Sequence, residues 1–209
     1  MDAAEAPGSS HKYVILVIVL AGVLMSVLDG IVVSIALPTI TGSFHVDISS
    51  SQWTITAYLV TLTSLLLFFG RVAEFTGRSL LFISGLAVFT LASLACGLSA
   101  TLAQLVAFRV VQGIGGAMVF SISGAILFLA FPQQERGRAM GYLGSTVAVG
   151  SILGPVLGGF LVDTLGWRSI FLINLPIGVV LVACSLLFLR THEKRATGFH
   201  MDWMTPRAA

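Results

Sequence analysis

Residues 150–159 read Gly150-Ser-Ile-Leu-Gly154-Pro155-Val-Leu-Gly158-Gly159 and lie inside a long apolar run. Three of the glycines, Gly150, Gly154 and Gly158, recur at four-residue intervals. In a helix they share one face and allow a second backbone to approach closely. Pro155 frees a backbone carbonyl and bends a helix, which a membrane helix tolerates where its neighbours compensate. The spacing by itself favours a static packing seam, and the alternative is a hinge in a helix that moves.

The composition excludes an ordinary soluble domain. Hydrophobic residues make up 56% of the 209 residues, charged residues only 10%, and the mean hydropathy is +1.00. Apolar runs of about twenty residues recur along the chain, which is the length needed to cross about 30 Å of hydrocarbon. The short alternating segments of a membrane barrel are missing from the sequence. The sequence therefore predicts an all-α membrane protein.

Six membrane spans are predicted, separated by short polar turns, at residues 14–37, 53–69, 80–98, 102–130, 139–162 and 169–189. Pro38 is expected to end the first span. Trp53 and Tyr58 are expected to open the second span as aromatic residues at the membrane interface. Residues 1–12 are predicted to be a disordered N-terminus, residues 13–190 a six-helix bundle, and residues 191–209 a tail.

The basic residues predict the orientation. With a cytoplasmic N-terminus, the outer loops hold only Arg168, and the cytoplasmic side collects Lys12, Arg71, Arg78, Arg136, Arg138, Arg190, Lys194, Arg195 and Arg207. This distribution follows the positive-inside rule, so both termini are predicted to be cytoplasmic in a multi-pass protein of the cell (plasma or inner) membrane. The net charge of +2 gives no indication of a nucleic-acid partner.

The sequence contains no recognisable catalytic or metal-binding pattern. Cys96 and Cys184 lie within apolar runs and are interpreted as small buried residues. All four His residues lie outside the predicted spans. The glycine-rich run at 112–117 follows no strand, so close helix packing is favoured over phosphate binding. The sequence therefore predicts no enzyme, no cofactor and no metal site.

The second and fifth spans end in similar patterns. The second is followed by Gly70-x-x-x-Glu74-x-x-Gly77-Arg78, and the fifth, on the opposite side of the membrane, by Gly159-x-x-x-Asp163-x-x-Gly166-x-Arg168. Two three-helix units of inverted topology would give this repeat, which is typical of secondary transporters.

Two ionisable residues, Asp29 and Arg109, lie deep within predicted spans. At 1.5 Å per residue they lie roughly 13 Å and roughly 10 Å from the outer ends of their helices, so they could pair if the first and fourth helices are neighbours. They are either a fixed ion pair that specifies packing or a site where Asp29 exchanges a proton under the control of Arg109. A further alternative places Arg109 against an anionic substrate.

Two polar residues are candidates for lining a cavity. Gln112 lies in the fourth span, shortly after Arg109. Asn174 lies beside Pro176 in the sixth span, and it either lines a cavity or only accompanies a kink.

The sequence resembles the N-terminal half of a major facilitator superfamily transporter, from the multidrug:proton antiporter branch with fourteen spans. The stretch Leu28-Asp29-Gly-Ile-Val-Val-Ser-Ile-Ala-Leu37-Pro38 is similar to the first-helix motif of that branch, with Asp29 at its acidic position. Residues 70–78 resemble its cytoplasmic loop motif, and residues 105–117 its fourth-helix motif. Residues 150–159 resemble its antiporter motif in the fifth helix, and residues 167–178 the segment that opens its sixth helix.

The resemblance implies one half of a major facilitator fold, built as two inverted three-helix repeats, and proton-coupled efflux of small amphipathic compounds or drugs. It implies proton coupling at Asp29 and Arg109. It further implies a cytoplasmic gate formed by Gly70, Arg71, Glu74, Gly77 and Arg78. It also implies an antiporter-motif helix that carries Gly150, Gly154, Pro155, Gly158 and Gly159. Glu74 stands where the family usually has Asp, and basic residues are fewer, so a weaker or rearranged gate is expected.

In this family the substrate cavity lies between two six-helix halves, and this sequence contains one. Asp202-Trp203 resembles the approach to a seventh helix that does not follow. A truncated or frameshifted product is favoured, and pairing with a second copy or a companion half-transporter is the alternative. The expected partners are the lipid bilayer, protons and a small-molecule substrate. The competing hypothesis is a non-transporting remnant or a membrane interaction module.

Overall fold

The computed structural model describes residues 9–196, and this part of the chain is helical without strands. Of the N-terminus predicted to be disordered (1–12), residues 1–8 lie outside the described residues, and residues 9–12 instead belong to the first helix. Of the predicted tail (191–209), residues 191–196 instead continue the last helix, and residues 197–209 lie outside the described residues. The elements are α1 (Ser9–Phe44), α2 (Ile48–Thr76), α3 (Arg78–Gly97), α4 (Leu102–Ala130), the short 3₁₀ helix η1 (Gln133–Glu135), α5 (Arg136–Leu165), α6 (Ser169–Leu172) and α7 (Asn174–Ala196).

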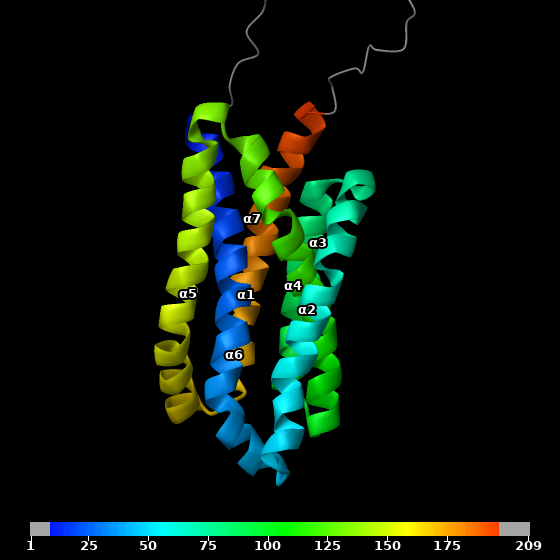
Figure 1. Cartoon of the computed structure of the whole chain (residues 1–209), viewed down its shortest axis with the longest axis vertical. Helices are drawn as coiled ribbons and strands as arrows, with labels where there is room; N and C mark the ends of the chain where they lie inside the picture. Colours follow the sequence, from blue (N-terminus) through cyan, green and yellow to red (C-terminus); the bar gives the residue numbers. More distant parts are fainter. Residues whose placement is uncertain (1–8, 197–209) are drawn as a thin grey trace, which may run out of the picture.

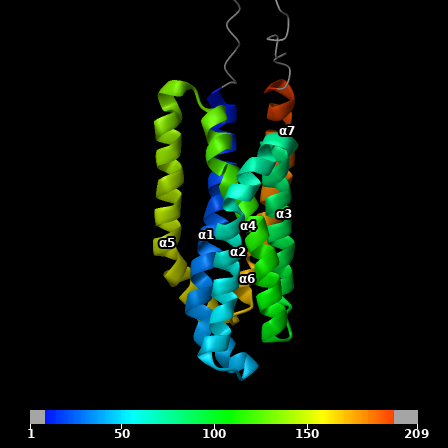
Figure 2. The ribbon, with the colours of Figure 1, turned by 45° about the vertical axis from the view of Figure 1, so that its right-hand side comes forward.

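The helices form an elongated bundle (Figure 1). Within the described residues, six stretches are long and apolar enough to cross a membrane, and α6 and α7 together make the sixth. The first residues of α1 and the last residues of α7 lie at one end of the bundle, here called the terminal end. The turns that follow α1, α3 and α5 lie at the opposite end, here called the far end (Figures 1 and 2).

Two predicted helix ends are wrong. Pro38 lies inside α1, which continues to Phe44, because a helix loses only one backbone hydrogen bond at a proline and membrane helices tolerate it. Residues 70–76, expected to form a charged turn, are the last two turns of α2. Hydropathy marks only the apolar part of a helix, whereas the backbone bonds that hold the helix continue beyond it. The turn itself is reduced to Gly77.

The two inverted three-helix repeats are confirmed. α1 packs against α5, and its counterpart α4 packs against α2, while α3 and α7 pack against each other (Figures 1 and 2). Gly77 ends α2 with φ 89°, and Gly166 ends α5 with φ 80° at the other end of the bundle. Each donates its backbone N–H to the carbonyl four residues earlier, of Ala73 and Val162 respectively. A positive φ favours glycine. The similar sequence patterns after the second and fifth spans therefore correspond to two equivalent helix ends.

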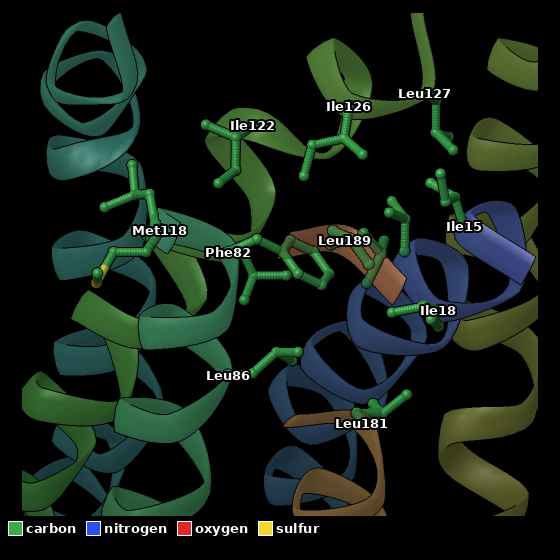
Figure 3. Close-up of a cluster of buried hydrophobic side chains, with 14 of the residues drawn as sticks. Ile15, Ile18, Phe82, Leu86, Met118, Ile122, Ile126, Leu127, Leu181 and Leu189 are labelled. Carbon is green, nitrogen blue, oxygen red and sulfur yellow. The ribbon is translucent and has the colours of Figure 1, made fainter. Parts of the chain in front are cut away.

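The apolar core is divided into two clusters along the bundle. The larger cluster joins α1, α2, α3, α4 and α7 towards the terminal end, and Figure 3 shows Phe82 of α3 among side chains from α1, α4 and α7. The smaller cluster lies towards the far end and includes Val33, Leu105 and Phe171. Cys96 is buried in the smaller cluster and Cys184 packs against the larger one, both as free thiols, as the sequence indicates.

Candidate functional site

A layer of polar side chains separates the two apolar clusters. On α1 the larger cluster ends at Met25 and the smaller one begins at Val32, so Asp29 lies between them. Arg109 and Gln112 on α4, Ser93 on α3 and Asn174 at the start of α7 occupy the same interval on their own helices. All five side chains are buried. Four helices therefore contribute to one buried polar site.

The site contains an ion pair between α1 and α4. Arg109 donates from Nη1 to Oδ2 of Asp29, and the relative exposure of the two residues is 0% and 3%. Arg109 also donates from Nε to the backbone oxygen of Thr54 at 3.0 Å. Its guanidinium carbon lies 4.0 Å from the centre of the Tyr58 ring, a distance typical of a cation–π contact. The predicted proximity of Asp29 and Arg109 is thus a direct contact.

Two amides complete the shell around the carboxylate. Gln112 Nε2 and Asn174 Nδ2 donate to Oδ1 of Asp29 at 2.9 and 3.0 Å. The same two nitrogen atoms donate to Oγ of Ser93 at 3.1 and 3.0 Å. Gln112 also accepts from Arg109 Nη1 at 2.7 Å, so the amide is tied to both members of the ion pair. Asp29 is therefore held by donors from α1's neighbours α4 and α7.

Three members of this site were not predicted from the sequence as part of it. Tyr58 was expected at the membrane interface, but only 1% of its surface is exposed, whereas Trp53 is 61% exposed. Tyr58 donates its hydroxyl to the backbone oxygen of Ser26 at 3.1 Å. Ser93 and Thr54 each lie near other Ser and Thr residues, so no sequence signal marked them.

Two buried polar atoms beside the ion pair have no partner among the described residues. These are Nη2 of Arg109 and Oγ1 of Thr54. Arg109 already bonds to the backbone of Thr54, so both atoms belong to residues in direct contact. An unpaired buried polar atom is costly, which makes this edge of the guanidinium the place for a further acceptor.

A cavity of about 350 Å³ reaches the site from the side of the bundle. It opens between α1, α5 and the α6–α7 segment, and its lining is apolar except at Asp29 and Asn174. Asn174 therefore lines a cavity and also marks a helix break, because α6 ends at Leu172 and α7 begins at Asn174. Gln112 bonds within the polar layer and does not line this cavity.

The glycine seam of α5 packs against the segment of α1 that carries Asp29. A Cβ added at Gly150 would lie 2.8 Å from the Val27 side chain, and one added at Gly154 would lie 2.8 Å from that of Ile31. A Cβ added at Gly158 would lie 3.0 Å from the Val32 side chain. The shared face predicted for these glycines is confirmed. A Cβ added at Gly159 would meet nothing within 4 Å. Pro155 is exposed, and the helix continues past it to Leu165. The two helices can lie this close because the glycines have no side chain.

The glycine-rich run on α4 has the packing role favoured by the sequence. A Cβ at Gly113 would lie 2.8 Å from the backbone oxygen of Tyr58, and one at Gly115 would lie 2.6 Å from the backbone nitrogen of Phe89. α4 is thus in close contact with α2 on one side and α3 on the other.

The predicted gate residues lie apart from the ion pair. Gly70, Arg71 and Glu74 belong to the last turns of α2 at the terminal end, and both charged side chains are exposed. Arg78 begins α3 and lines a surface cavity of about 400 Å³. Nothing in the described range groups three or more His, Cys, Asp or Glu side chains as a metal site would.

Sequence relatives of this chain are transporters and resistance proteins. It is 39% identical over 179 residues to the riboflavin transporter RibZ of Clostridioides difficile, a match that covers 86% of this chain and 39% of that protein. It is 35% identical over 209 residues to multidrug resistance protein 3 of Bacillus subtilis, covering 97% of this chain and 39% of the relative. It is 38% identical over 193 residues to the methylenomycin A resistance protein of Streptomyces coelicolor, covering 90% of this chain and 41% of that protein. The chain thus spans about two fifths of the length of these relatives.

A solved structure shares the fold. The bacterial homologue of the human lysosomal transporter Spinster, in an inward-facing and occupied conformation, superposes with a TM-score of 0.76 at 18% identity. The match covers 87% of this chain and 45% of that one. The six helices therefore form one half of the fold of that protein.

The family model described as the Major Facilitator Superfamily matches residues 19–205, which include all the residues of the polar layer. With the fold, this match identifies the multi-pass protein as a member of the Major Facilitator Superfamily.

Proposed function

We propose that the protein acts in proton-coupled efflux of small amphipathic compounds across the cell membrane, with Asp29 as the proton-exchanging group. The observation that carries the proposal is the ion pair between Asp29 and Arg109, buried among four helices. An ionisable pair inside a membrane is costly, and where it occurs it marks a proton or substrate pathway by default.

Protonation of Asp29 would change the balance of contacts in the site. A neutral carboxyl no longer holds the guanidinium by charge, while Arg109 keeps its bonds to Gln112 and to the Thr54 backbone. The link between α1 and α4 would then be reduced to the hydrogen bond from Gln112, whereas α4 would remain tied to α2. A proton shifts the equilibrium between two conformations only if they differ in their affinity for it, and the loss of this link supplies that difference.

The glycine seam is the element proposed to move. It holds α5 against Val27, Ile31 and Val32, on either side of Asp29 in the sequence. A change in the charge of Asp29 therefore acts on the stretch of α1 against which α5 packs. Small residues allow two helices to slide because few side chains interlock between them.

The substrate class follows from the cavity and from the relatives. The cavity that reaches Asp29 and Asn174 has apolar walls and a polar end, which suits an amphipathic molecule. The relatives include a riboflavin transporter and two resistance proteins. Completion of the transport pathway is proposed to require a second six-helix half, provided by a companion chain or a second copy.

The orientation proposed has both termini in the cytoplasm. Lys12, Arg71, Arg78, Arg136 and Arg138 lie in elements at the terminal end of the bundle, and Arg168 lies at the far end. An excess of basic residues marks the cytoplasmic side. The gate proposed for Gly70, Arg71, Glu74, Gly77 and Arg78 would then act on the cytoplasmic side.

Flux measurements in everted vesicles test the proposal. Vesicles containing the protein are expected to accumulate ethidium when their interior is acidified. Asp29→Asn is expected to abolish this accumulation at an equal amount of protein in the membrane. Asp163→Asn is the matched control, because Asp163 is an exposed acid outside the polar layer. Unchanged accumulation in Asp29→Asn vesicles would reject the proton-coupling role.

A membrane interaction module is the second candidate, favoured by the exposed apolar faces of α2 and α5, which include Leu67 and Phe160. In that case the ion pair only fixes helix packing. Co-purification of two differently tagged copies, followed by the ethidium assay, separates the candidates. Absence of flux under every proton gradient, in a protein that is correctly inserted, would favour the module.

A further inference from the structure

The cavity that reaches Asp29 continues to the far end of the bundle. A second cavity, of about 420 Å³, lies at the α5–α6 turn, and Leu161 and Ile173 line both cavities. The two cavities therefore adjoin beside α6 and the start of α7. The cavity that reaches Asp29 is called here the inner cavity, the second the outer cavity, and the two together the groove. From Arg168 to Ile177 the groove follows nine residues, or about 13 Å at the rise of a helix.

The groove is open because the sixth span is interrupted and α5 is packed elsewhere. α5 packs mainly against α1 along the glycine seam, and its contacts with α4 and with the short α6 are much less extensive. Ile173 lies between α6 and α7, and Pro176 stands in the first turn of α7. The side chains at the mouth, which include Phe160, Ile173 and Ile177, are exposed on the side of a membrane-spanning bundle. Lipid is the solvent on such a surface.

One cation stands at the far-end rim of the groove. Arg168 lines the outer cavity and is exposed. It donates from Nη2 to the backbone oxygen of Ser99 at 3.0 Å, and its guanidinium carbon lies 4.3 Å from the centre of the Trp167 ring. These contacts fix the guanidinium at the far-end turns, and the group has five N–H donors, of which one is used by Ser99. Asp163, the acid nearest in the sequence, lines neither cavity.

We propose that this groove, defined by the two cavities, binds an anionic phospholipid of the far-end leaflet. The phosphate would lie at Arg168, and one acyl chain would fill the apolar groove towards Asn174. A guanidinium recognises phosphate by charge and by paired hydrogen bonds. The walls offer almost no polar group over the length of the groove, which a hydrocarbon chain matches and a water-filled channel does not. The groove includes the cavity proposed above for the substrate, so lipid and substrate would compete for it. Lipid binding is measured without transport, so its failure and the failure of the proposed function are distinguishable.

Binding of phosphatidylglycerol to the purified chain in detergent tests the charge. The dissociation constant is measured by native mass spectrometry for the protein and two variants. Arg168→Gln is expected to weaken binding about fivefold, as one basic residue at a membrane surface does. Arg138→Gln is the matched control, an exposed arginine at the terminal end that also lies beside an aromatic ring. Equal weakening in both variants, or none in Arg168→Gln, would overturn the headgroup site.

Filling the groove tests the acyl chain. Ala21 lines the inner cavity, so Ala21→Phe is expected to remove the tightest phosphatidylglycerol binding. Ala148→Phe, on an exposed face of α5, is expected to leave it unchanged. Unchanged binding in a folded Ala21→Phe protein would contradict the proposal.

A photoreactive lipid provides a test that needs no variant. Phosphatidylglycerol with a diazirine at the end of one acyl chain is expected to label residues 157–161 or 170–177 of the unaltered protein. Labelling confined to other segments would overturn the proposal whether or not the variants fold.

Discussion

Arg109 on α4 donates to Asp29 on α1, although 80 positions separate them in the sequence. The contact joins the first helices of the two inverted repeats at the level where both apolar clusters end. Removing either partner leaves a charge buried without its counter-ion. The stability of the bundle is therefore expected to depend on the pair as a unit rather than on each residue.

A double-mutant cycle tests this dependence. Arg109→Gln is expected to lower the free energy of unfolding by about 3 kcal/mol, because the buried carboxylate loses its counter-ion. Asp29→Asn with Arg109→Gln is expected to recover part of that loss, because no unpaired charge remains. Unfolding in mixed detergent micelles provides the measurement. Losses that simply add in the double variant would show that the residues act independently.

The glycine seam makes a second prediction about stability. Gly154→Val is expected to destabilise the bundle by about 1–3 kcal/mol, because a Cβ there would already lie 2.8 Å from Ile31 Cγ2. Gly159→Val on the same helix is the matched control, since its Cβ would meet nothing within 4 Å. Thermal unfolding of the two variants should separate them. Equal melting temperatures would mean that α1 and α5 do not pack as described.

The two equivalent helix ends are expected to respond alike. Gly77 and Gly166 combine φ of 89° and 80° with ψ of 140° and 164°, a region that other residues rarely adopt. Alanine at either position should therefore cost about 1–3 kcal/mol. Gly144→Ala, inside α5 and facing open space, should be neutral or stabilising because alanine favours the helix. A tolerated alanine at Gly77 or Gly166 would argue against the equivalence.

Asp47 predicts a pH dependence outside the spans. It caps α2, and the Ser50 hydroxyl followed by the Ser50 backbone N–H lowers the pKa of Asp47 below its ordinary value of 3.8. A lowered pKa in the folded state stabilises the fold above the unfolded value, and this contribution is lost as the pH falls through the folded pKa. Ser50→Ala should raise the pKa of Asp47 towards 3.8.

Carboxyl NMR of labelled aspartate measures that shift, and thermal unfolding between neutral and acid pH measures its effect. Asp47→Asn should remove this part of the acid destabilisation. An unchanged titration of Asp47 in the Ser50→Ala protein would contradict the capping role.

The sequence predicted the architecture because lipid leaves few alternatives. The length of the apolar runs predicted six membrane spans. The repeated pattern of glycine and acidic residues predicted two three-helix repeats of inverted topology. Helix ends were predicted less well, because Pro38 and Arg71 lie in helices whose backbone bonds continue past the signals read from side chains. Hydropathy does not measure those bonds.

The polar site was predicted in part for a related reason. Asp29 and Arg109 are conspicuous because charge is rare inside a span, and helical rise placed them at similar depth. Tyr58 was misplaced because an aromatic residue near a predicted span end is usually interfacial, and the real α2 begins earlier, at Ile48. Ser93 contributes through its position between two amides, which only the packing of α3, α4 and α7 creates.

The most direct test of the central claim is the infrared titration of Asp29. The difference spectrum between the unaltered protein and Asp29→Asn isolates one carboxyl group from the exposed acids. In that difference spectrum we expect a protonated-carboxyl band that grows reversibly on acidification. Superimposable titrations of the unaltered protein and Asp29→Asn would contradict it, because Asp29 would then exchange no proton.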